Sequence, residues 1–198
     1  MQISELEAVN LIRGSTGKAP VSNLLGDNPD VKAAQNRLKN TTLELQSNSW
    51  WFNTELSVTL TPDVSGDIIY PSNALEVRPH DPFTYLTMRG NKLYDPNKQS
   101  YTFTSSVVVD MLLALDFEEL PYAAANFVQY DAARKFLADF DGDPQRIAEL
   151  SRDAASAGIT LKTAEQRNRR VNVLHQAGPM RMLGRLQPRY TGNRVMFS

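Results

Sequence analysis

The sequence predicts an α+β fold in which a β-rich region is inserted into an antiparallel helical bundle. Apolar residues recur every three to four positions near both ends of the chain, which is typical of amphipathic helices. Between Glu55 and Leu115 they recur at every second position instead, which is typical of strands. Prolines from Pro62 to Pro96 also suit short strands and loops better than helices. With 198 residues and no cysteine, the chain can bury a sizeable core without disulfides.

Two helices are predicted before the β-rich region. The first ends before Gly14 and carries apolar residues at intervals of three: Ile3, Leu6, Val9 and Ile12. The second has a clear start, because Asn28 suits the N-cap and Pro29 suits the first helical position. We expect this helix to continue to about Asn48.

Several short strands are predicted next. Leu56, Val58 and Leu60 alternate with polar residues, and the runs "DIIYP" and "LEV" are further candidates. The run "TYLTMRGNKLYD" predicts a hairpin with its turn at Gly90-Asn91. The run "SSVVVDMLLAL" predicts a strand that leads toward a helix at Pro121.

Two more helices follow. The first has Pro121 in its first turn and is expected to carry a stripe of Phe127, Tyr130, Arg134, Leu137 and Phe140. Asp143 and Pro144 predict the cap and first turn of the second, which should extend to about Arg169. Its stripe is Ile147, Leu150, Ala154, Ala157, Leu161 and Ala164, and the small residues in it allow close packing.

These elements predict three regions. Residues 1–50 and 118–170 form a discontinuous helical bundle, residues 51–117 form the β-rich insertion, and residues 171–198 form an extended basic C-terminal arm. Trp50, Trp51 and Phe52 stand where the chain first crosses from helix to strand. Large aromatic residues at such a crossing are usually core, and adjacent residues of an extended segment point to opposite sides, so Trp50 and Phe52 can share one face whereas Trp51 cannot.

Charge is distributed unevenly along the chain. Residues 1–161 contain 13 basic and 21 acidic residues, a net charge of −8, whereas residues 162–198 contain 8 basic residues and Glu165, a net charge of +7. The basic end can bind nucleic acid or an acidic protein surface, or it can be a solubilising end.

No motif predicts catalysis, a cofactor or a metal. The run "GSTGKA" has two residues between its glycines where a phosphate loop has four, and alanine follows its lysine. The run "DFDGDP" resembles a calcium loop but has Pro144 where glycine is needed and Leu150 where the last glutamate is needed. His80 and His175 have no catalytic context and are expected at the surface. We therefore expect a protein that is not an enzyme.

The chain is not expected to enter a membrane. Its first ten residues carry acids where a signal peptide carries basic residues, and no apolar run reaches the ~18 residues of a membrane span. We expect a soluble protein that is not exported.

Several fragments, taken in order and with their spacing, resemble the tail tubular protein A family, the head-to-tail adaptors of short-tailed bacteriophages. They are "AVNLIRGSTGKAPVSNL", "QSNSWWFN" with the strand and "LTPD" after it, "LYD", "DFEELP" and "DAARKF". The resemblance extends from about Ala8 to Arg170. The family pattern keeps Trp50 and Phe52 while leaving the middle position free, so we expect Trp50 and Phe52 to be core anchors and Trp51 to be partly exposed at a subunit interface.

The resemblance implies a virion structural protein, made in the host cytoplasm and located in the phage tail below the portal vertex. It implies a dodecameric ring that joins the portal protein to the tail nozzle, which is formed by a protein like tail tubular protein B. Double-stranded DNA would pass through the ring at ejection, and contact with tail fibres is left open.

The basic arm has no family motif that can be mapped residue by residue. We expect it to dock on the portal through Arg167, Arg169, Arg170, Arg181, Arg185, Arg189 and Arg194. The alternative is a DNA-binding module that acts through the same arginine-rich arm.

Overall fold

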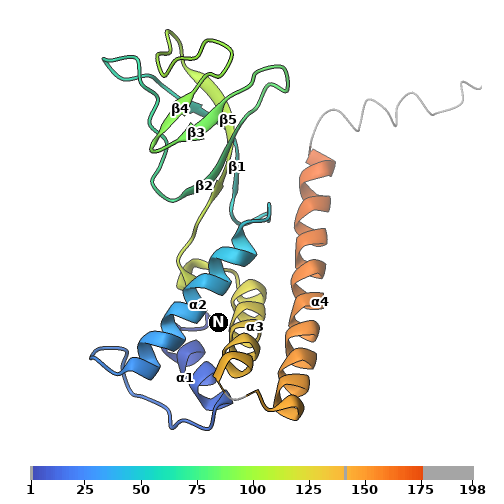
Figure 1. Ribbon diagram of the computed structural model, residues 1–198. Coiled ribbons are helices and arrows are strands. Elements are labelled where there is room, and N and C mark those ends of the chain that lie inside the picture. The colour runs from blue at the N-terminus through green and yellow to red at the C-terminus, as the bar shows by residue number, and fades with distance from the viewer. Residues whose placement is uncertain (1, 141, 176–198) are drawn as a thin grey trace, which may run out of the picture.

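The computed structural model describes residues 2–140 and 142–175 (Figure 1). Its helices are α1 (Glu5–Ser15), α2 (Pro29–Gln46), the 3₁₀ helix η1 (Phe117–Glu119), α3 (Tyr122–Phe140) and α4 (Pro144–His175). Its strands are β1 (Thr54–Leu60), β2 (Ala74–Pro79), β3 (Thr87–Arg89), β4 (Lys92–Tyr94) and β5 (Val107–Leu113). Helices at both ends of this range with small antiparallel sheets between them confirm the predicted α+β class.

The four α-helices, called here the helical body, pack around α3, which contacts α1, α2 and α4. Half of the buried residues of α3 are alanine, and small side chains let several helices approach it closely. The predicted stripe on this helix is only partly right. Leu137 is buried, but Phe127, Tyr130 and Arg134 are only half-buried and Phe140 is 63% exposed. A helix that is covered on several sides has no single apolar stripe, so its periodicity could not identify the buried face.

Local signals place the helix ends where they were predicted. The Asn28 side chain accepts a hydrogen bond from the Asp30 amide at 3.0 Å, and the Asp143 side chain accepts one from the Gln145 amide at 2.9 Å. The run "GSTGKA" is the end of α1 and the turn after it, with Gly17 at φ +74°. One boundary differs from expectation, because α4 continues six residues beyond Arg169, to His175.

Residues 54–113, called here the β part, form two small antiparallel sheets. One has the strand order β1-β5-β2, and the other is the β3-β4 hairpin, whose turn contains Gly90 at φ +65° as predicted. Their shared core includes Ile68, Leu93 and Val109, all fully buried. The run "DIIYP" is not a strand, because Asp67 and Ile69 form only isolated bridges, to Thr102 and Lys92.

A β-bulge interrupts the alternation of β1. The register with β5 shifts between Glu55 and Val58, and Ser57 has φ +57°. Val58 and Leu60 pack against the core of the β part, whereas Leu56 is 62% exposed on the other face of the sheet. Strict alternation would place Leu56 on the same face as Val58 and Leu60. The bulge places it on the opposite face instead.

Buried amide groups join the β part to the helical body. The Gln46 side chain is fully buried, and it donates to the Leu115 carbonyl at 2.9 Å and accepts from the Leu115 amide at 2.8 Å. The buried Asn53 side chain donates to the Gln46 carbonyl at 2.8 Å and accepts from the Trp50 amide at 2.9 Å. The Asn53 carbonyl accepts from the Leu113 amide at 2.9 Å. The chain thus leaves the helical body and returns to it through one hydrogen-bonded unit.

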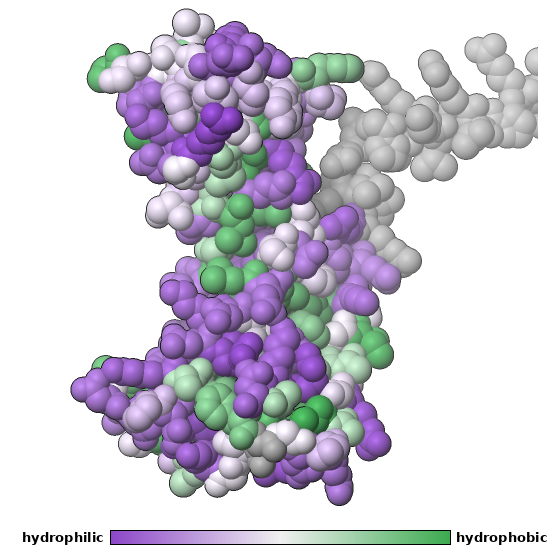
Figure 2. Space-filling view, in the orientation of Figure 1, coloured by the Kyte–Doolittle hydropathy of each residue, from purple (hydrophilic) through white to green (hydrophobic). Residues whose placement is uncertain are grey.

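The molecule is elongated, with the helical body at one end and the β part at the other (Figure 1). The helix α4 lies beside α3 and continues beyond it toward the level of the β part. The face shown in Figure 2 is largely hydrophilic over the β part, and hydrophobic residues gather along the narrow waist between the two parts and again near the opposite end. The waist is therefore the place to look for a functional surface.

We predict that Gln46→Ala destabilises the folded chain strongly. The change removes the side-chain partner of both the amide and the carbonyl of the half-buried Leu115, which costs roughly 2–4 kcal/mol in the free energy of unfolding. Urea unfolding followed by circular dichroism measures this. The control is Gln166→Ala, on the exposed side of α4, which should change stability by less than about 0.5 kcal/mol. Equal effects of the two substitutions would contradict the role given to Gln46.

Candidate functional site

Residues 47–53 form the turn between α2 and β1, called here the aromatic turn. The Trp50 indole N–H donates to the Leu45 carbonyl at 2.8 Å, which fixes this ring on the end of α2. The rings of Trp50 and Phe52 are nearly parallel with centroids 6.2 Å apart, and Trp51 meets Phe52 edge-on at 5.0 Å. The turn is thus a single aromatic cluster.

All three aromatic residues are half-buried and pack against the core of the helical body. Trp51 is thus no more exposed as a class than Trp50 and Phe52. The reason is that these residues form a turn and not an extended segment with two opposite sides. The assignment of Trp50 and Phe52 as core anchors and of Trp51 as a subunit contact stays a prediction.

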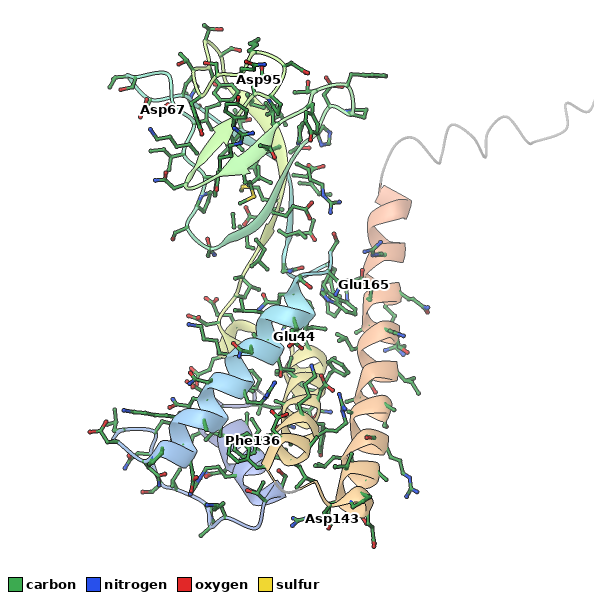
Figure 3. The ribbon with its side chains drawn as sticks, in the orientation of Figure 1. Glu44, Asp67, Asp95, Phe136, Asp143 and Glu165 are labelled. Atoms are coloured by element: carbon green, nitrogen blue, oxygen red, sulfur yellow. The ribbon has the colours of Figure 1, made fainter. Side chains whose placement is uncertain are left out.

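The helix α4 reaches the aromatic turn beyond the end of α3. Its Glu165 side chain accepts a hydrogen bond from the Trp51 amide at 3.1 Å, and Figure 3 shows Glu165 beside the turn. The Arg169 guanidinium pairs with Glu165 and donates to the Ser49 carbonyl at 2.9 Å. These contacts hold the last described turns of α4 near the β part.

A groove of about 400 Å³, called here the crossing groove, lies between the aromatic turn, the outer face of the β1-β5-β2 sheet and α4. Its apolar lining includes Trp50, Trp51, Leu56 and Leu112. Its charged lining is Glu76, Arg78, Asp110 and Arg169. The groove therefore presents an apolar floor with charges of both signs around it.

Asp110 organises the sheet face of this groove. Its carboxylate accepts a hydrogen bond from the Ser57 amide at 2.8 Å, which holds the bulge that directs Leu56 outward. The His80 ring nitrogen Nδ1 lies 2.9 Å from the same carboxylate oxygen. Burial raises the pKa of Asp110, but the hydrogen bonds from Ser57 and His80 outweigh this effect and hold the pKa below its ordinary value.

The predicted arm residues fall into two groups. Arg167 is exposed on α4, and Arg169 makes the contacts described above. Arg170 belongs to α4, but its side chain is not among those that the structure describes. Arg181, Arg185, Arg189 and Arg194 lie outside the described residues, as does everything after His175.

Two of the three aspartates of "DFDGDP" make structural contacts, and Asp141 lies outside the described residues. Asp139 pairs with Arg37, and Asp143 caps α4. Within residues 2–140 and 142–175, no group of three or more His, Asp or Glu side chains is placed to hold a metal ion. In the same ranges, no helix is both long enough and apolar enough to cross a membrane.

A family model described as tail tubular protein matches residues 6–171, which include the whole β part and nearly all of the helical body. The chain belongs to the tail tubular protein family. Tail tubular protein A of Klebsiella phage KP34 is 32% identical over 167 residues, which cover 84% of this chain and 89% of that protein. As a tail tubular protein, the chain is a structural component of the phage tail and of the virion. The family match gives no support to the alternative of a DNA-binding module.

Sequence reasoning identified the aromatic turn but missed the residues that position it. Gln46 and Asn53 flank the turn in "QSNSWWFN", and two amide side chains around an aromatic run were the available signal. Nothing in the sequence indicated that Asp110 and Arg169, far apart along the chain, would line the same groove.

We predict that His80→Ala raises the pKa of Asp110, because it removes a group that favours the ionised carboxylate. In the intact chain, the folded-state pKa lies below the ordinary value of 3.8, so the stabilisation by this carboxylate is present above that pH. It is lost as the pH falls through the folded-state pKa.

NMR titration of the Asp110 carboxyl carbon measures the midpoint, which should move upward in His80→Ala. In the control His175→Ala, which removes the other histidine, it should not move. An unchanged or lower midpoint in His80→Ala would show that His80 does not act on Asp110.

Proposed function

We propose that this tail tubular protein is the adaptor subunit that joins the portal at the capsid vertex to the tail nozzle. In this proposal, copies of the chain, twelve in number, form a ring through which the genome leaves the capsid. The observation that carries the proposal is the extent of the family match. It begins near the start of α1 and ends within the last turns of α4, so it includes the elements that build both parts of the molecule.

The charge distribution supports a channel role. Residues 1–161 carry a net charge of −8, and an acidic wall repels the phosphates of DNA. A basic wall would hold DNA through many phosphate contacts and slow its passage. A ring whose lumen is formed by this acidic body would let double-stranded DNA slide through without adsorbing to it.

The arginines at the end of the chain support docking on the portal. Arg181, Arg185, Arg189 and Arg194 follow α4 without any acidic residue between them. Each exposed ion pair is worth little alone, but a ring presents the same set on every subunit, and linked contacts raise the total affinity strongly. We propose that these arginines, together with the exposed Arg167, contact an acidic surface of the portal.

The mass of the purified chain, alone and mixed with portal protein, tests the adaptor proposal. Native mass spectrometry or light scattering should show a complex that contains several copies of the chain per portal ring. A chain that stays unbound in the presence of portal protein but shifts on duplex DNA would contradict the proposal.

We predict that replacing Arg181, Arg185, Arg189 and Arg194 together with glutamine weakens portal binding by at least about tenfold, because four exposed charge contacts are lost from each subunit. Light scattering of portal mixtures over a range of salt concentrations measures the change. The matched control replaces four exposed basic residues of the described body with glutamine: Lys32, Lys39, Lys98 and Arg152. Both variants lose the same charge, so equal weakening would show that net charge matters and the arm does not.

A further inference from the structure

We infer that the crossing groove is a docking site for the chain's own C-terminal segment, residues 176–198, through its apolar stretch Met180–Leu186. The inference concerns the isolated chain and does not rest on the adaptor proposal. It assigns an intramolecular partner to a surface that the described residues leave open.

The groove has the composition of a site for apolar side chains. Trp50, Trp51 and Leu112 contribute apolar surface, and Leu56 is 62% exposed at its edge. Among the described residues, the buried side-chain polar atoms without a partner are Arg13 Nε and Thr41 Oγ1, and neither residue lines the groove. The groove therefore offers no unsatisfied buried polar group to orient a polar small molecule, and an apolar peptide segment fits it better.

The C-terminal segment begins close to the groove. Arg169 lines the groove, and α4 ends six residues later at His175, about 9 Å further along the helix axis. An extended chain covers about 3.3 Å per residue, so three residues suffice to return to the level of Arg169. Gly178-Pro179 is a dipeptide that marks turns and stops helices, and it stands directly before Met180.

The composition of the segment matches the groove. The stretch Met180–Leu186 reads "MRMLGRL" and offers four apolar side chains in seven residues. Methionine fits irregular apolar surfaces and makes favourable sulfur contacts with aromatic rings, which the two tryptophans of the groove supply. Three of the chain's six methionines lie in residues 176–198, so this end of the chain is suited to an aromatic groove.

Charge favours the same pairing. Residues 176–198 contain four arginines and no acid, a net charge of +4. Residues 1–175 contain 17 basic and 22 acidic residues, a net charge of −5, and the two values sum to the −1 of the chain. Around the groove, the carboxylates of Glu76, Asp110 and Glu165 face the guanidinium groups of Arg78 and Arg169, so the local charge is −1. The arginines at positions 181 and 185 can approach these carboxylates while the apolar side chains enter the groove.

Intrinsic fluorescence tests the inference in the full chain, because both tryptophans of the protein line the groove. The variant Met182→Asp/Leu183→Asp should release the segment, so acrylamide should quench the tryptophans more strongly and their emission should move to longer wavelength. The matched control Val195→Asp/Met196→Asp adds the same charge outside the proposed stretch and should leave both quantities as in the natural chain. Equal quenching in all three proteins would overturn the inference.

A second variant tests the groove from the other side. Leu56→Asp should also raise the quenching, and it should add nothing once Met182→Asp/Leu183→Asp is present, because both changes break the same contact. Docking within one chain does not depend on concentration. The difference between the natural chain and the variant must therefore persist on hundredfold dilution. A difference that disappears on dilution would show that a second copy occupies the groove, which also overturns the assignment to the chain's own segment.

Discussion

The structure depends on the buried hydrogen bonds of Gln46 and Asn53, through which the chain leaves the helical body and returns to it. Gln46 binds both backbone groups of Leu115, a residue 69 positions away, and Asn53 binds the Gln46 carbonyl. Buried polar groups tolerate little displacement, because an unpaired amide or carbonyl in the interior is costly. These bonds therefore fix the orientation of the β part on the helical body and the conformation of the aromatic turn between them.

The crossing groove is a consequence of that fixed orientation. Because the aromatic turn is anchored to the end of α2, it can contact both the sheet and the far end of α4. The α4 end is held there by Glu165 and Arg169, beyond the residues through which α4 packs on α3. The crossing thereby sets the position of the end of α4, which carries the exposed Arg167, and this suits the proposed ring, in which every copy would present the same residues to a neighbour.

Local signals in the sequence predicted the elements, whereas long-range contacts decided which faces are buried. Asn28, Asp143 and the Gly90-Asn91 turn act through neighbouring residues, and their roles were predictable. The bulge at Ser57 depends on Asp110 from another strand, so the exposure of Leu56 could not be predicted from neighbouring residues. The alanine-rich face of α3 and the groove itself arise from elements distant in sequence, and no periodicity or spacing encodes them.

Electron cryomicroscopy of the tail in intact virions tests the central claim most directly. The account predicts a ring of this chain between the portal and the nozzle, with the basic end of each subunit against the portal and the acidic body around the channel. Density for the chain at another place in the tail, or without contact to the portal, would contradict it.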